Sequence, residues 1–152
     1  MDNTMALLLS DTYKQCHDRM YPKGLTKLVS YWVPRKSMLE NQNEMVFFGL
    51  QAFIKEYLMG YFQKNFFDLS EEEMLTLYIN SMDVQIGRDN YDLDKIVDLH
   101  RLGYLPLEIR ALSEGTLVPM GVPCIEITNT DDKFGAVKAA LQCMKRAGEI
   151  AA

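Results

Sequence analysis

Two short segments carry side chains whose types and spacing suit ligand binding. The first is Ser10-Asp11-Thr12-Tyr13-Lys14, where Ser10 or Asp11 can cap a helix that follows. A helix start presents unpaired N–H groups and a partial positive charge, and the ring of Tyr13 can stack on a flat heteroaromatic ligand. The Asp11 carboxylate can accept a hydrogen bond from an amide or a ring N–H, although an aspartate at this place is more often only the cap.

The second segment is Tyr31-Trp32-Val33-Pro34-Arg35-Lys36, in which a predicted strand ends at a proline and two cations follow. A guanidinium and an ammonium at a rigid strand end can bind a phosphate group. Most Arg-Lys pairs on protein surfaces bind nothing, so the residues alone leave both interpretations open.

The rest of the chain lacks the common catalytic motifs. No GxGxxG, GxxxxGK[ST], HExxH or GxSxG pattern occurs, which argues against the usual nucleotide, zinc-protease and serine-hydrolase sites. Cys16, Cys124 and Cys143 are widely spaced and odd in number, which predicts reduced thiols and neither a disulfide framework nor a metal site. His17 and His100 stand alone on predicted helices, where a histidine is usually at the surface or half-buried.

Composition and charge narrow the class of protein. The 152 residues are 48% hydrophobic and 24% charged, as expected of one soluble globular domain. A net charge of −5 argues against nucleic-acid binding but is compatible with a small anion held by local cations. The first residues do not resemble a signal peptide, and no apolar run approaches the roughly 20 residues that cross a bilayer. We therefore expect a cytoplasmic protein with no membrane partner.

Periodicity and turn signals predict the elements that position these segments. Helices are expected over residues 12–20, 45–62, 70–86, 92–102 and 132–150, and strands over 26–33, 107–112, 116–120 and 122–128. Ser70 and Glu73 form a capping box, and Gly103 is expected to end a helix. Glu114-Gly115 predicts a turn, and Asn129-Thr130-Asp131 offers caps for the last helix. This order predicts an α+β fold with an antiparallel sheet and packed helices.

Several motifs in series resemble those of nicotinamide phosphoribosyltransferases, and the related nicotinate enzymes share part of the pattern. The ordered likeness covers about residues 6–133. Its motifs are Leu8-Leu9-Ser10-Asp11-Thr12-Tyr13-Lys14, His17, Tyr21-Pro22, Ser30-Tyr31-Trp32, Arg35, Val46-Phe47-Phe48-Gly49-Leu50-Gln51, Leu105-Pro106-Leu107-Glu108-Ile109, Glu114-Gly115, Val118-Pro119-x-Gly121 and Asn129-Thr130-Asp131.

The resemblance implies the N-terminal domain of a type II phosphoribosyltransferase. Such an enzyme is a homodimer that transfers the phosphoribosyl group of phosphoribosyl pyrophosphate to nicotinamide, with Mg²⁺, in NAD biosynthesis. Its active site lies at the dimer interface. By resemblance, Tyr13 stacks on the pyridine ring from the neighbouring subunit, Asp11 lies nearby, and Arg35 binds phosphate or pyrophosphate.

The sequence departs from the family in two ways. The α/β barrel that follows in the family is absent, so no catalytic residue is assigned and no cofactor is expected on this chain alone. Residues 134–152 do not resemble the family's continuation, and we expect them to form a helix packed on the domain of residues 1–133. That tail is a divergent end, an artificial join or the end of a short paralogue.

Three functions are compatible with these features. The first is a phosphoribosyltransferase part that is inactive alone and pairs with a barrel-containing chain. The second is a non-catalytic ligand-binding or dimerisation domain derived from the family, and the third is a purely structural oligomerisation domain.

Overall fold

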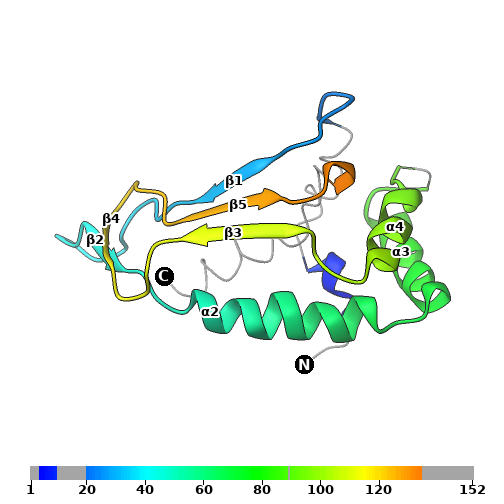
Figure 1. The fold of residues 1–152 in the computed structure, drawn as a ribbon, viewed down its shortest axis with the longest axis horizontal. Coiled ribbons are helices and arrows are strands. Elements are labelled where there is room, and N and C mark those ends of the chain that lie inside the picture. The colour runs from blue at the N-terminus through cyan, green and yellow to red at the C-terminus, as the bar shows by residue number, and fades with distance from the viewer. Residues whose placement is uncertain (1–3, 10–19, 89, 135–152) are drawn as a thin grey trace.

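The computed structural model describes residues 4–9, 20–88 and 90–134. In this part the backbone forms a three-stranded antiparallel sheet, a two-stranded antiparallel ribbon and several helices (Figure 1). The sheet has the order β1-β5-β3, with β1 at Val29–Trp32, β3 at Leu107–Ala111 and β5 at Ile125–Asn129. The predicted α+β class is confirmed, and the described residues form no closed barrel.

The two faces of this sheet differ in polarity because side chains alternate along each strand. Ile127 on β5 lies in register with Ser30 and Ile109 and is buried on the inner face. Glu126 lies in register with Tyr31 and Arg110, so that this row points to the other face. The sheet therefore packs on the core with one face and presents polar groups with the other.

The strands are shorter than predicted, and β5 begins three residues late. Pro123 has no N–H to donate to a ladder, which explains why β5 begins after it. β4 occupies Leu117–Pro119 within the predicted strand.

β4 pairs with a strand that the sequence did not predict, β2 at Glu44–Val46. The predicted helix start at Met45 is therefore wrong. Phe47 N–H donates to Thr116 O at 2.8 Å, which continues the extended pairing past β2. Gly49 then has a φ of 92°, which no helical residue adopts, and the helix begins only after it.

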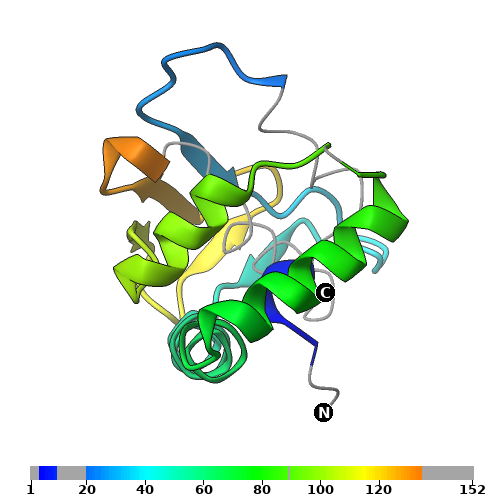
Figure 2. The same ribbon diagram turned by 90° about the vertical axis from the view of Figure 1, so that its right-hand side faces the viewer.

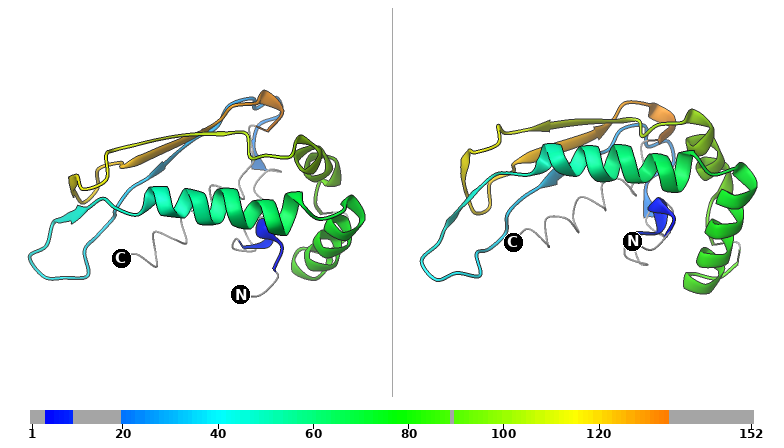
Figure 3. Two further views of the ribbon diagram at one scale, coloured as in Figure 1. Left: turned by 60° about the horizontal axis from the view of Figure 1, so that its bottom comes forward. Right: turned by 90° about the horizontal axis from the view of Figure 1, so that it is seen from below.

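The long helix starts as α2 (Leu50–Phe53) and continues into the π-helical segments η3 (Ile54–Tyr61) and η4 (Gln63–Phe67). It runs along the sheet, below it in Figure 1 and in front of it in the view from below (Figure 3). Gly49 has no side chain to cap the first turn, so Glu114 Oε1 accepts the hydrogen bond of Gln51 N–H at 2.9 Å. The helix passes its predicted end at Phe62 because Phe66, fully buried, extends the apolar face.

Two further helices match the prediction closely. α3 spans Glu71–Gln85 and begins with the expected capping box, in which Ser70 Oγ accepts from Glu73 N–H at 3.2 Å and Glu73 Oε2 accepts from Ser70 N–H at 3.1 Å. α4 spans Leu93–Leu102 and ends at Gly103, whose φ is 78°. Both lie at the end of the molecule that faces the viewer in Figure 2.

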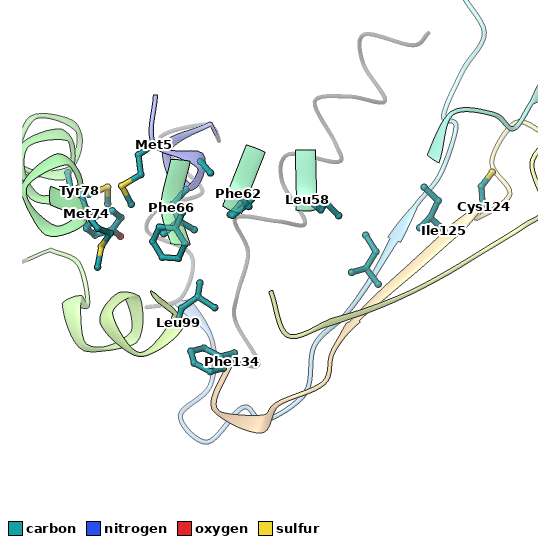
Figure 4. Packing of buried hydrophobic residues seen from close by; sticks show 14 of the residues in the cluster. Met5, Leu58, Phe62, Phe66, Met74, Tyr78, Leu99, Cys124, Ile125 and Phe134 are labelled. Atoms are coloured by element: carbon teal, nitrogen blue, oxygen red, sulfur yellow. The ribbon is translucent and has the colours of Figure 1, made fainter. Parts of the chain in front are cut away.

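A single cluster of buried apolar side chains joins these elements (Figure 4). At one end Met5, before the short helix η1 (Ala6–Leu8), packs near Met74 and Tyr78 of α3. At the other end lie Cys124 and Ile125, at the start of β5. The long helix supplies the residues between them, of which Leu58, Phe62 and Phe66 are buried.

Several predictions fall at the limits of the described chain. Of the helix predicted over residues 12–20, only Met20 is described, and it is exposed. Of the last predicted helix, the structure describes only η5 (Asp132–Phe134), a short 3-10 turn. None of the described helices combines the length and the apolar composition that a membrane crossing requires.

Candidate substrate-binding site

Arg35 lies in the loop that follows β1, with an exposed side chain. The residue before it, Pro34, is buried, and its carbonyl oxygen accepts a hydrogen bond from Gly121 N–H at 2.6 Å. Two residues before Pro34, the carbonyl oxygen of Trp32 accepts a hydrogen bond from Cys124 N–H at 2.9 Å. The predicted rigid strand end before a cation is therefore confirmed.

The segment of residues 35–42, named here the Arg35 loop, is held mainly by local contacts. Ser37 Oγ donates to Leu39 O at 3.2 Å and accepts from Leu39 N–H at 3.0 Å. Lys36 is exposed beside Arg35, and neither cation has an ion-pair partner among the described residues. Two unpaired cations on one exposed loop provide an electropositive point to which a phosphate group can bind.

The loop returns to the fold at Asn43, whose carbonyl oxygen accepts a hydrogen bond from Met120 N–H at 2.8 Å. Met120 and Gly121 belong to the tight turn Pro119–Val122, named here the clamp turn, which joins β4 to β5. The turn is closed by Val122 N–H donating to Pro119 O at 3.2 Å. Two consecutive amides of one turn thus bind the residues on both sides of the Arg35 loop.

A row of polar groups crosses the outer face of the three-stranded sheet. The carboxylate of Glu126, on the central strand, accepts a hydrogen bond from the Tyr31 hydroxyl and raises the pKa of that phenol by this bond and by its charge. Arg110, in register on the other side, bonds Glu108 Oε1 at 2.9 and 3.0 Å. Tyr31 could be singled out from the sequence but Glu126 and Arg110 could not, because only the pairing of β5 with β1 and with β3 brings the three residues together.

His100 and Cys124 both lie among structural contacts. His100 is half-buried, with Nε2 at 2.9 Å from Leu69 O and its ring edge-on to Phe66, as expected for a lone helical histidine. Cys124 is a free thiol in the core, and burial raises its pKa. No group of three or more His, Cys, Asp or Glu side chains suited to a metal ion occurs in the described ranges.

Asp11 and Tyr13, the predicted pyridine side of the site, lie outside the described residues. Their roles in binding the pyridine ring therefore stay predictions. Two other motifs of the resemblance fall on turns: Glu114-Gly115 forms a turn, with a φ of 90° at Gly115, and Gly121, with a φ of 87°, lies in the clamp turn.

Comparison with known proteins decides the family. A family model described as "Nicotinamide phosphoribosyltransferase, N-terminal domain" matches residues 5–109, more than half of the chain. The chain belongs to this family. A curated nicotinamide phosphoribosyltransferase from Acinetobacter baylyi is 38% identical over 129 residues, which are 82% of this chain and 26% of the relative.

The fold has a counterpart among solved structures. Human nicotinic acid phosphoribosyltransferase matches 92% of this chain and 24% of its own chain, with a TM-score of 0.56 and 17% identity. At that identity the likeness concerns the fold alone. This member of the nicotinamide phosphoribosyltransferase family spans about a quarter of the length of the relatives that it matches.

Proposed function

We propose that this chain is the N-terminal part of a nicotinamide phosphoribosyltransferase, which needs a barrel on the same or another polypeptide for activity. The observation that carries the proposal is the 38% identity over 82% of the chain to an enzyme with that name. The exposed Arg35, which has no ion-pair partner among the described residues and directly follows the buried, hydrogen-bonded Pro34, supports it independently.

In the proposed reaction the pyridine nitrogen of nicotinamide forms a bond to C1 of the ribose. The bond between C1 and the pyrophosphate oxygen breaks, and its electron pair leaves with pyrophosphate, giving nicotinamide mononucleotide. The transition state carries positive charge on the ribose and growing negative charge on the leaving group. Cations held close to that group lower the barrier, because they are favoured most when the charge has developed.

The chain's own residues serve the two ends of this reaction in the proposal. Arg35, and Lys36 beside it, bind phosphate or pyrophosphate oxygens, for which a planar guanidinium is well shaped. Tyr13 stacks on the pyridine ring and Asp11 accepts a hydrogen bond from the ligand, by resemblance. Mg²⁺, when bound in the complete enzyme, would neutralise part of the pyrophosphate charge. The active site forms in a homodimer or with a barrel-containing chain.

The alternative function is a non-catalytic domain of the same family that binds a pyridine ligand or a family member. For that function the binding residues Asp11, Tyr13 and Arg35 suffice, and turnover is not required. The two functions differ in one respect, which is turnover in the presence of a barrel.

The test is an assay with nicotinamide, phosphoribosyl pyrophosphate and Mg²⁺, run on the chain alone and after mixing with a family barrel expressed separately. We expect no nicotinamide mononucleotide from the chain alone and turnover from the mixture. In the mixture Tyr13→Ala should raise the KM for nicotinamide, and nicotinate should compete poorly. Robust turnover by the chain alone would overturn the need for a barrel, and a mixture that binds but never turns over would favour the non-catalytic domain.

A further inference from the structure

The Arg35 loop has both of its ends fixed by one short turn. Pro34, before the loop, accepts from Gly121 N–H, and Asn43, after it, accepts from the neighbouring Met120 N–H, at 2.6 and 2.8 Å. The loop's own hydrogen bonds are local and exposed. The clamp turn therefore supplies the long-range contacts that set where the loop leaves and rejoins the fold.

The bond to Pro34 acts directly on the orientation of Arg35. The carbonyl of Pro34 and the amide nitrogen of Arg35 belong to the same planar peptide unit, so fixing that oxygen fixes the plane on which the Arg35 Cα is built. Pro34 adds a restricted φ and is itself buried. Gly121 thus restrains the peptide plane from which the backbone and side chain of Arg35 start.

The clamp turn has the backbone of a type II turn, which explains its residues. Gly121, third in the turn, has a φ of 87°, while Met120, second, has a negative φ, since Asn41 is the one described non-glycine residue with a positive value. A type II turn requires a positive φ at its third position and favours proline at its second. A Cβ at Gly121 would meet nothing within 4 Å, so glycine is needed there for conformation and not for space.

We infer that Met120 and Gly121 are positioning residues for phosphate recognition, which hold Arg35 in its binding orientation through the two ends of its loop. This inference rests on the proposed function, because it presumes that Arg35 binds phosphate. It assigns a role in the site to a turn that is far from Arg35 in the sequence and that does not itself touch the ligand.

The decisive variant is Met120→Pro. Proline suits the second position of a type II turn, so the substitution keeps the turn and removes the N–H that binds Asn43. Gly121→Ala is the second variant, which strains the turn while keeping both N–H groups. Gly103→Ala is the matched control, since Gly103 has a similar φ of 78° and equally open space but caps α4.

The probe is inorganic pyrophosphate, titrated into the full chain and followed by the backbone amide NMR signals of the Arg35 loop, which every variant retains, with the thermal midpoint measured alongside. We expect Arg35→Ala to weaken binding by about tenfold, as loss of a charge-assisted hydrogen bond does. Met120→Pro and Gly121→Ala should weaken it by about threefold to tenfold, whereas Gly103→Ala should lower the thermal midpoint and leave affinity unchanged.

The outcomes distinguish a failure of the positioning role from a failure of phosphate binding by Arg35. If Arg35→Ala weakens binding and both turn variants bind like the original chain, the positioning role is overturned and the phosphate role of Arg35 stands. If Arg35→Ala and the original chain bind pyrophosphate equally, or neither binds, the phosphate role is overturned and the inference falls with it. If Gly103→Ala loses as much affinity as Gly121→Ala, the effect is one of general stability and the positioning role is overturned.

Discussion

Asn129 bonds three backbone groups through one buried side chain, and so joins the segment that enters β1 to the one that leaves β5. Its Nδ2 donates to Thr26 O at 2.7 Å and to Asp131 O at 2.8 Å, and its Oδ1 accepts from Leu28 N–H at 2.8 Å. Of the predicted caps Asn129-Thr130-Asp131, it is Asp131 that caps η5, with its Oδ1 accepting from Lys133 N–H at 2.8 Å. Asn129 is instead the last residue of β5, and its amide bonds the chain that enters β1.

We predict that Asn129→Ala lowers the free energy of unfolding by roughly 2 to 3 kcal/mol, because three hydrogen bonds are lost and their backbone partners are left unpaired. Urea denaturation followed by circular dichroism measures this change. Thr130→Ala, at an exposed neighbouring residue, is the control and should stay within about 0.5 kcal/mol of the original chain. An Asn129→Ala variant as stable as the control would show that water replaces the amide without cost.

At the scale of elements, the sequence predicted those parts of the fold whose signals are local. The capping box of α3 and the Gly103 end of α4 both lie within a few residues of what they determine. β2 could not be predicted in this way, since two residues of the helical pattern, Met45 and Val46, become part of a strand only because β4 pairs with them. The cap of α2 by Glu114 could not be predicted either, because Glu114 is 63 residues from Gln51, whose N–H it binds.

In the candidate site, too, local features could be predicted from the sequence and contacts with distant residues could not. A strand end before Pro34 and Arg35 could be predicted from the residue types, because proline restricts its own backbone and that of its neighbour. The contacts of the clamp turn could not, since no local pattern in residues 33–43 indicates that Met120 and Gly121 bind there.

The first turn of α3 makes stability depend on acid pH. Hydrogen bonds from Arg101 lower the pKa of Glu71, and those from Ser70 lower the pKa of Glu73, below an ordinary value of 4.5. A carboxyl whose pKa is lower in the folded state than in the unfolded state stabilises the fold above its unfolded pKa. That contribution is lost as pH falls through the folded value.

We therefore expect the urea midpoint to fall as pH is lowered from about 4.5, over and above the general effect of carboxyl protonation. The double variant Glu71→Gln with Glu73→Gln should be less stable near pH 7 and should show a smaller fall. Glu72→Gln, in the same exposed turn, is the control and should keep the slope of the original chain. If the urea midpoint fell equally with pH in the original chain and both variants, the hydrogen bonds of Glu71 with Arg101 and of Glu73 with Ser70 would not contribute to this pH dependence.

At the scale of the whole molecule, one buried cluster spans both ends of the described fold. Cys124, at the end away from α3, is 2% exposed, and burial raises the pKa of its thiol. Both effects lower its reactivity, because the thiolate is the nucleophile and the reagent must reach it. The rate at which the Cys124 thiol reacts therefore measures whether the β5 end of the core opens while the rest stays folded.

We predict that iodoacetamide modifies Cys124 at least about a hundredfold more slowly in the folded chain than in urea, since access requires unfolding of the core. Mass spectrometry of peptides separates Cys124 from Cys16 and Cys143. A folded-state rate close to that in urea would mean that the β5 end of the core opens locally.

The pairing of early strands with late ones sets an order on folding during synthesis. β1 is preceded by Thr26 and Leu28, whose bonds to Asn129 span 103 and 101 residues, and β5 is the centre of its sheet. A nascent chain therefore has α3 and α4, with their local caps, well before β1 or β2 has a partner. Translation that stops before Ile125 leaves β1 and β3 without β5, their shared partner. The unpaired edges of both strands are then exposed to aggregation, and no smaller sheet forms in place of the complete one.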